Sequence, residues 1–379
     1  MHNVLYVSHT ARLGGAEHSL LLLLEHLDRD RFRPMVAVPA RGPLTRRLDE
    51  LGVGHCVVGM SRIERSHNPV TLARYFLMWR RAIGRIAELI RDLDIDLVHA
   101  NSTTAHLFAA PAAKRRHVPC VWHVRDASSP GGWLDRMMVR NARAIVAISE
   151  SVRSGLHHPR MAADKTSVIP NGVDTERFAP AERMTVRNEL GLSVATPAAG
   201  ILGQVVPWKR HDLFLEAAAA VSRRLPEARF LVVGDNRFGD WPGLIDGLRQ
   251  QSQRLGIADR VLFLGWRDDV VAILNAMDVL VMTSENEPFG RVVIEAMACG
   301  KPVVSFRCGG PAEIIEHEKT GLLVAPRDVS GLAGAMERLL ADPARCAEMG
   351  KLAREHVCRK FSAELCAGRV QEVYARLLR

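Results

Sequence analysis

Two glutamates in the second half of the chain, Glu287 and Glu295, lie on either side of a Pro-Phe-Gly tripeptide. The apolar run before them, residues 278–283, is typical of a buried parallel strand, and the apolar residues after them predict a helix that ends at Gly300. A strand, a short loop and a helix start form an anion site, because unpaired backbone N–H groups and the positive end of the helix dipole converge there. Such a loop can bind phosphate while two carboxylates accept hydrogen bonds from hydroxyl groups.

A purely structural interpretation of these residues is also open. Glu295 could pair with Arg291 one helical turn earlier, an interaction that contributes roughly 0.2–0.5 kcal/mol, while Glu287 stays in solvent. The surroundings of Glu295 weigh against this interpretation. It lies among apolar residues at 292–297, where a solvated carboxylate is not expected.

Two glutamates separated by seven residues around Pro-Phe-Gly resemble the signature of the retaining nucleotide-sugar glycosyltransferases of family 4, which have the GT-B fold. In that family the first glutamate contacts hydroxyls of the donor sugar, the Phe-Gly backbone contacts the phosphates, and the second glutamate binds the ribose. By resemblance these roles fall on Glu287, on Phe289 with Gly290, and on Glu295. The fold implied is α/β, with two Rossmann-like, doubly wound domains that face each other across a cleft.

Two motifs in the first half extend the resemblance. The double glycine Gly14-Gly15 follows an expected strand, where it suits either close approach to a ligand or simply a tight turn into the next helix. In relatives this loop lies beside the donor phosphates and the acceptor, so Gly14, Gly15 and Glu17 become candidates for substrate binding. A lone histidine such as His123 is more often structural, but the family has a histidine after this strand that contacts the donor sugar near the reaction centre.

The segment after Gly203 departs from the family pattern in one position. The family usually has an arginine after this glycine and a lysine five residues later, which together neutralise the departing diphosphate. Lys209 matches that lysine, whereas Gln204 replaces the arginine and adds no charge, so leaving-group stabilisation must be weaker or come from elsewhere. We expect Arg291 to supply part of the missing charge. Arg267 lies in a segment that resembles the part of the fold that receives the nucleotide base.

The resemblance implies a retaining glycosyltransferase that moves a sugar from a nucleoside-diphosphate sugar to an acceptor hydroxyl. The expected catalytic residues are His123, Glu287 and Lys209. A UDP-sugar is the donor expected first and a GDP-sugar next, and the acceptor is expected to be a carbohydrate or a lipid-linked molecule in surface polysaccharide, glycolipid or related synthesis. The Asp-x-Asp at 94–96 is expected at the amino end of a strand, and GT-B enzymes generally need no metal, so no metal or other cofactor is expected.

Two alternatives from other functional classes remain open. A nucleotide-sugar epimerase of similar two-domain build would turn over the donor without an acceptor. A non-catalytic sugar-nucleotide binding protein is favoured only by Gln204.

Short β-rich runs alternate with helical patterns along the whole chain, which predicts parallel sheets with crossover helices. The expected strands of the first half are 4–8, 35–38, 56–58, 96–100, 120–124, 145–148 and 167–169, and those of the second half are 199–202, 230–233, 261–264, 279–282, 303–305 and 322–324. We therefore expect an acceptor-side domain over 1–173 and a nucleotide-sugar domain over 174–360. By resemblance the last helix, within 361–379, packs back on the first domain.

At 379 residues, 47% of them hydrophobic, the composition predicts a soluble globular protein large enough for two domains. The seven scattered cysteines predict free thiols in a reducing cytoplasm. Residues 1–190 hold 27 Lys plus Arg against 19 Asp plus Glu, whereas the remainder holds 24 against 23. No nucleic-acid motif accompanies this basic half, so nucleic acid is not an expected partner. An amphipathic helix over 71–91 with five arginines suits either packing on the first sheet or peripheral contact with anionic lipid at the inner face of the membrane.

Overall fold

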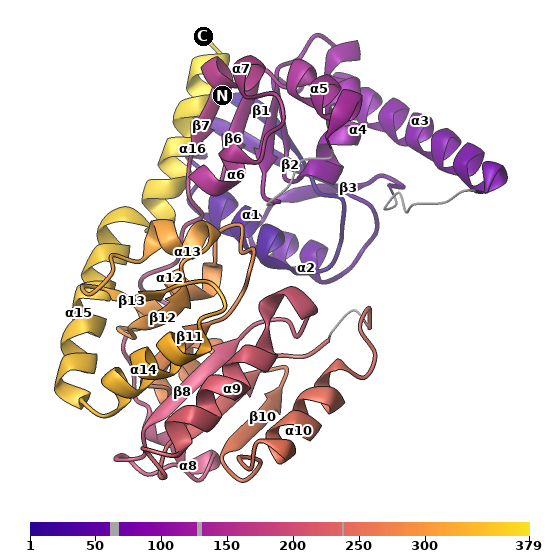
Figure 1. Cartoon of the computed structure of the whole chain (residues 1–379). Coiled ribbons are helices and arrows are strands. Elements are labelled where there is room, and N and C mark those ends of the chain that lie inside the picture. Colours follow the sequence, from indigo (N-terminus) through magenta and orange to yellow (C-terminus); the bar gives the residue numbers. More distant parts are fainter. Residues whose placement is uncertain (61–67, 127–130, 237–238) are drawn as a thin grey trace. The chain divides into compact units, whose positions relative to one another are not determined.

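The chain folds into two compact units, each built on one parallel sheet (Figure 1). The computed structural model describes residues 1–60, 68–126, 131–236 and 239–379. Unit 1 comprises Met1–Gly172 and Ala363–Arg379, and unit 2 comprises Val173–Ser362. Helices cover both faces of each sheet, so the expectation of two doubly wound α/β units is confirmed.

The sheet of unit 1 is formed by β1 (His2–Val7), β2 (Phe32–Val38), β3 (Gly54–Val57), β4 (Leu97–Ala100), β5 (Cys120–Val124), β6 (Ala144–Ala147) and β7 (Thr166–Val168). Their order is β3-β2-β1-β4-β5-β6-β7, with parallel pairings. From β1 the strand order runs to one side through β2 and β3 and to the other side through β4 to β7, so it reverses between β1 and β4. The carboxyl ends of these strands therefore form a topological switch point, where open α/β sheets bind ligands.

Strand alternation divides the core of unit 1 into two layers. Val4 and Tyr6 of β1 face the helices α1 (Gly15–Glu25), α2 (Pro43–Glu50) and α16 (Ala363–Leu377), whereas Leu5 and Val7 face α3 (Pro69–Asp92) and α4 (Thr103–Arg115). Shorter helices complete the unit: α5 (Gly132–Asn141), α6 (Glu150–Ser154), α7 (Pro159–Ala162) and the 3₁₀ turn Ala163–Lys165. The C-terminal helix α16, yellow in Figure 1, thus belongs to the core of the N-terminal unit.

The sheet of unit 2 is formed by β8 (Ala198–Leu202), β9 (Arg229–Val233), β10 (Val261–Gly265), β11 (Val279–Met282), β12 (Val303–Phe306) and β13 (Gly321–Val324), in the order β10-β9-β8-β11-β12-β13. Its helices are α8 (Met184–Glu189), α9 (His211–Ser222), α10 (Leu244–Arg254), α11 (Val270–Ala276), α12 (Arg291–Ala298), α13 (Gly309–Ile314), α14 (Val329–Leu340) and α15 (Pro343–Lys360). A 3₁₀ turn, Pro207–Lys209, follows β8. The switch point of this sheet lies between β8 and β11.

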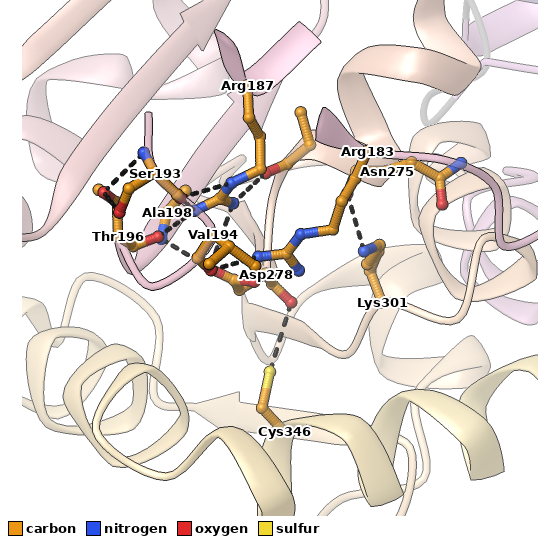
Figure 2. Close-up of polar contacts among 11 residues, drawn as sticks. Arg183, Arg187, Ser193, Val194, Thr196, Ala198, Asn275, Asp278, Lys301 and Cys346 are labelled. Carbon is orange, nitrogen blue, oxygen red and sulfur yellow. Dashed lines mark hydrogen bonds and ion pairs between the residues drawn. The ribbon is translucent and has the colours of Figure 1, made fainter. Parts of the chain in front are cut away.

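A buried arginine ties together the amino ends of β8 and β11 (Figure 2). Arg187 has no exposed surface, and its guanidinium donates to the carbonyl oxygens of Ser193, Thr196 and Ala276, the last at 2.6 Å. Asp278 lies 3.8 Å from Arg187 and also accepts from the Ala198 backbone N–H at 2.8 Å. Because this cluster satisfies several backbone groups at one edge of the sheet, it serves the stability of unit 2.

Helix α3 is only partly covered by the rest of unit 1. The second half of its apolar face, which includes Ile83 and Ile86, is buried. Leu72 and Phe76 in the first half are exposed, and Figure 1 shows this end of α3 extending away from the rest of the unit. This end is exposed because α3 is longer than the helix that covers it. Helix α3 has 24 residues and α4 has 13, so the first turns of α3 extend beyond α4.

Candidate active site

In unit 2, a glutamate in the loop between β11 and α12 contacts a lysine in the 3₁₀ turn after β8. Lys209 Nζ lies 3.1 Å from Glu287 Oε2, with 18% and 15% of the two side chains exposed. The Ser284 hydroxyl donates to the same carboxylate oxygen at 3.3 Å. Gly290, the residue before α12, has φ +93°, a left-handed conformation that favours glycine. The helix start therefore lies directly beside an ion-paired carboxylate.

Two glycines at the start of α13 explain how this loop is shaped. Gly309 and Gly310 pack so closely on it that a Cβ atom would lie 2.2 Å from the Glu287 carbonyl oxygen and 2.3 Å from Phe289 Cα, respectively. The Gly310 N–H also donates to the Glu287 carbonyl at 2.9 Å. Because neither position has a side chain, the start of α13 can pack directly against the backbone of Glu287 and Phe289.

The loop after β8 is held to the loop after β11 by hydrogen bonds. Thr283 Oγ1 donates to the Lys209 carbonyl at 2.7 Å, and the Glu285 N–H donates to the Trp208 carbonyl at 3.1 Å. Gly203 leaves space for the lysine, because a Cβ there would lie 3.3 Å from Lys209 Nζ. The position of the Lys209 ammonium is thus determined by both loops.

Further ion pairs surround this pair. Arg210 contacts Asp212 at 2.7 Å and also Glu285, and these hydrogen bonds, first of all those to Asp212, raise the pKa of Arg210. Arg327 contacts Glu285 at 2.7 Å, and this hydrogen bond is the main reason that the pKa of Glu285 is lowered. Both interactions keep the groups charged across the neutral pH range.

Three further residues of unit 2 that were expected at the donor site, Arg291, Gln204 and Arg267, have different surroundings. Arg291 NH2 lies 2.9 Å from Glu295 Oε1, so the i,i+4 pair of the structural interpretation exists, although both side chains are largely buried. Gln204 follows β8 and is half-buried, as is Lys209. Arg267, after β10, is separated from β8 by β9, and its guanidinium contacts Glu189 at 2.6 Å and Asp269 at 2.7 Å.

In unit 1, Glu17 is buried beneath the double-glycine loop. Its Oε2 accepts from the Gly14 N–H at 3.1 Å, and its Oε1 accepts from the Ser8 hydroxyl at 3.4 Å. Burial raises the pKa of this carboxyl, while Arg125 and the local hydrogen bonds act in the opposite direction. Glu17 therefore shapes the turn at Gly14, directly before Gly15 and the start of α1, by binding its backbone.

His123 lies near the carboxyl end of β5 and is buried, with 5% exposure. Its Nδ1 lies 3.2 Å from His99 Nε2 and 3.3 Å from Arg125 NH2. Arg125 also donates to Asn171 Oδ1 at 2.6 Å and to the Oδ1 of Asn101 at 3.0 Å. Burial, helped by Arg125 and His99, holds the pKa of His123 well below its usual range.

Sequence reasoning missed the partners of His123. His99 interrupts an apolar strand, Leu97–Ala100, and Asn101 follows it directly, so a polar residue within a buried run was the available signal. Arg125 stands two residues after His123 and could have been found by the same logic. Asn171 is distant in sequence and carries no local signal.

Within the described ranges, no group of three or more His, Cys, Asp or Glu side chains is arranged to hold a metal ion. None of the helices in the described part of the chain is long and apolar enough to cross a membrane.

Comparisons with known proteins match both units. The model for glycosyl transferases group 1 matches residues 183–356, and the model for Glycosyltransferase Family 4 matches residues 13–177. The N-acetyl-alpha-D-glucosaminyl L-malate synthase of Bacillus anthracis is 28% identical over 306 residues, 78% of each chain. The D-inositol 3-phosphate glycosyltransferase of Corynebacterium aurimucosum is 31% identical over 299 residues, covering 77% of this chain and 69% of that one. The crystal structure of Anabaena HepE in complex with UDP and glucose has a TM-score of 0.84 and 27% identity, and covers 99% of this chain and 100% of that chain.

Proposed function

This chain belongs to the family 4 glycosyltransferases, and we propose that it transfers the sugar of a UDP-sugar to a hydroxyl of a glycoconjugate acceptor. Enzymes of this family take the sugar from a nucleotide-sugar and retain its anomeric configuration, so the epimerase and the non-catalytic alternatives are set aside. UDP is favoured over GDP because HepE, the similar structure, is bound to UDP and glucose. In this proposal unit 2 binds the donor and unit 1 receives the acceptor.

The observation that carries the donor site is the contact between Lys209 and Glu287 at the start of α12. An incoming diphosphate would take the lysine as its counter-ion, which frees Glu287 to accept hydrogen bonds from sugar hydroxyls. The Gly290 amide and the positive end of the α12 dipole add stabilisation without further charge. Phe289 contributes backbone to the same loop, and Glu295 binds the ribose hydroxyls.

The reaction proposed is same-face displacement. The acceptor oxygen forms a bond to the anomeric carbon while the bond from that carbon to the diphosphate breaks, and the acceptor proton passes to an oxygen of the departing phosphate. The protein then has two tasks, to position the reactants and to stabilise the negative charge that develops on the leaving group. Lys209 serves the second task, and His123 lines the reaction centre.

Gln204 leaves this site with one cation fewer than the family pattern. We propose that Arg291 offsets part of the difference, since it stands on the first residue of α12. An Arg291→Ala variant should lower turnover at least tenfold. Full turnover in that variant would remove Arg291 from the reaction.

The acceptor is proposed to be lipid-linked and to belong to surface polysaccharide or glycolipid synthesis. The first turns of α3 support this, because Val70, Leu72, Phe76 and Leu77 are exposed beside the exposed cations of Arg74, Arg80 and Arg81. An apolar strip flanked by cations suits the surface of an anionic bilayer. Such contact would hold the enzyme peripherally at the membrane that presents the acceptor.

A thermal-shift screen tests the donor assignment. UDP, GDP, ADP and dTDP, with their common sugars, would be added to the protein, and a ligand at 100 times its Kd adds about 2.7 kcal/mol of stability. We expect a clear shift with UDP or a UDP-sugar that is lost in Lys209→Ala and Glu295→Ala. Lys351→Ala, at an exposed position of α15, is the matched control and should keep the shift. A shift by GDP alone would replace the donor, and loss of the shift in the control would void the assignment of Lys209.

Sedimentation with vesicles tests the acceptor side. Binding to vesicles that contain anionic lipid should exceed binding to zwitterionic vesicles, and should fall with added salt and in Phe76→Ser. Leu352→Ser, an exposed leucine of α15, should bind as the wild type does. Equal binding to both kinds of vesicle, or none, would contradict the membrane contact. An acceptor array that includes L-malate and inositol 3-phosphate then tests soluble hydroxyl compounds.

A further inference from the structure

A line of polar side chains crosses the otherwise apolar face of the unit 1 sheet. Tyr6 of β1, His99 of β4 and His123 of β5 all face the same side, as the alternation of their strands requires, and Val4, Val121 and Val146 surround them in the core. Tyr374 of α16 reaches this line from the last turns of the chain and is fully buried. Buried polar groups of this kind must find partners or they destabilise the fold.

The contacts form a chain that ends at His123. The Tyr374 hydroxyl lies 2.7 Å from His99 Nδ1, and His99 Nε2 lies 3.2 Å from His123 Nδ1. Ring edges also pack, because the His99 ring lies 5.2 Å from that of His123 and 5.8 Å from that of Tyr374, both near perpendicular. One side of the His123 imidazole is thus held by groups that reach across the sheet to the C-terminal helix.

Arg125 determines the direction of these hydrogen bonds. A guanidinium has five N–H donors and no acceptor, so the His123 Nδ1 that lies 3.3 Å from Arg125 NH2 must carry a lone pair. His99 Nε2, which faces the same lone pair, must then donate its proton to it. His99 Nδ1 is left to accept from the Tyr374 hydroxyl. Tyr374, His99 and His123 thus each have one consistent role in these contacts.

This assignment fixes the state of His123. Its single ring proton is on Nε2, which is buried and has no hydrogen-bond partner within the described part of the chain. Burial lowers the pKa of His99 to about 3 and holds that of His123 well below its usual range, so both rings stay neutral near pH 7. A buried N–H without a partner is destabilising, and an oxygen of a bound substrate would supply the missing partner.

We propose that His99 and Tyr374 are positioning residues that, together with Arg125, hold His123 in its Nε2–H tautomer, so that His123 presents a single hydrogen-bond donor to an oxygen of the donor sugar. The sugar as ligand rests on the proposed function, whereas the tautomer does not. In this arrangement His123 neither accepts nor supplies a proton during transfer. The opposite tautomer would present a lone pair instead, to which a sugar hydroxyl could only donate, so the direction of this hydrogen bond would be reversed.

Nuclear magnetic resonance of protein with ¹⁵N-labelled histidine tests the tautomer directly and needs no substrate. At pH 7 both His99 and His123 should give the ring nitrogen shifts of neutral Nε2–H imidazole, with assignments from His99→Gln and His123→Gln. In Tyr374→Phe, which keeps the ring packing, His99 should lose its fixed tautomer and donate less to His123 Nδ1, so the Nδ1 shift of His123 should move while Arg125 keeps that ring in the Nε2–H form. A charged or Nδ1–H His123 in the wild type would overturn the proposal, as would an unchanged His123 in both Tyr374→Phe and His99→Leu.

Kinetics test the consequence for the sugar. His99→Leu should lower kcat by roughly 10- to 100-fold with little change in KM, and His99→Gln, whose amide N–H can replace the Nε2 donor, should recover most of that loss. His106→Gln is the matched control, because His106 is also a buried histidine and instead contacts the Met138 carbonyl at 3.0 Å. It should leave kcat and the His123 signals unchanged, even where stability falls.

The two levels of the proposal fail separately. Equal losses in His99→Leu and His99→Gln would remove the positioning role even in an active enzyme. If no nucleoside-diphosphate sugar is bound or turned over by the wild type, the sugar is the wrong ligand and the proposed function fails, while the ring shifts still decide the tautomer.

Discussion

Replacing Gly310 by alanine should disable the donor loop without altering any residue that is proposed to touch the donor. Gly310 has an ordinary backbone conformation, so alanine brings no dihedral strain there. The new Cβ would lie 2.3 Å from both Cα and O of Phe289, and real Cβ atoms essentially never approach other atoms within 3.0 Å. The neighbouring segment is backbone, which cannot rotate out of the way as a long side chain would.

The size of the effect follows from this overlap. To reach ordinary contact, the loop that carries Glu287 and Phe289 must move away from α13 by about 1 Å, and a misplacement of about 1 Å can lower a rate by roughly 10²-fold. The hydrogen bond from the Gly310 N–H to the Glu287 carbonyl, now 2.9 Å, would also lengthen. We therefore expect kcat/KM to fall by roughly two orders of magnitude.

The assay is release of nucleoside diphosphate from the donor that the thermal-shift screen identifies, together with the melting temperature of each variant. Gly334→Ala is the control, because Gly334 lies within α14 of the same unit and nothing lies within 4 Å of the Cβ it would gain. Alanine in place of a helix-interior glycine should stabilise the control by about 0.5–1 kcal/mol and leave activity intact. A folded Gly310→Ala enzyme that keeps more than half of the wild-type kcat/KM would refute the steric reasoning.

Three other changes have expected outcomes. Gln204→Arg should tighten binding of the nucleoside diphosphate about tenfold in calorimetry, and unchanged or weaker binding would mean that the phosphates lie elsewhere. Burial lowers the pKa of His211 to about 4. Between about pH 6.5 and this value the unfolded chain binds a proton at His211 and the native state does not, so the free energy of unfolding of the wild type falls as the pH falls. Relative to wild type, His211→Leu should thus gain about 2 kcal/mol between pH 7.5 and pH 5 in denaturant titrations, and no gain would contradict the shifted pKa. Arg187→Met should destabilise unit 2 by about 3–5 kcal/mol in the same titrations, because it leaves carbonyls and Asp278 without their charged partner, and a loss below about 1 kcal/mol would show that this cluster is dispensable.

Sheet structure was predictable because its signal is local. Each expected strand is present within a few residues of its expected bounds, for example 279–282 as Val279–Met282 and 145–148 as Ala144–Ala147. A strand buried on both faces shows itself as a short apolar run between turns, and such runs need no knowledge of their partners. The order of the strands then follows from the doubly wound pattern.

Side-chain partnerships were less predictable, because they join residues that no local pattern connects. Tyr374 and His99 are 275 positions apart, and Lys209 and Glu287 are 78 apart. The Glu17 carboxylate could have been predicted, since a glutamate three residues after a helix N-cap commonly accepts from the N-cap backbone N–H. The structure shows the Glu17 carboxylate in this capping role.

The exposed half of α3 shows a different limit of sequence reasoning. Apolar spacing along a helix identifies a face, but the extent to which that face is buried depends on the length of the element that covers it. Phe76 and Ile86 share the same pattern, yet only Ile86 is buried. Helix spacing alone therefore could not distinguish packing on the sheet from exposure to a partner.

Charge balance in unit 2 explains why Gln204 matters. Lys209 contacts Glu287, Arg291 contacts Glu295, and Arg210 and Arg327 both contact Glu285, so these cations already face carboxylates before a donor binds. A diphosphate would add negative charge to a cluster that is close to neutral. Its binding must then draw on neutral donors, namely the start of α12 and the Gln204 amide, or must separate a cation from its carboxylate. An arginine at position 204 would add the missing cation without breaking an existing pair, which is why Gln204→Arg is expected to strengthen binding.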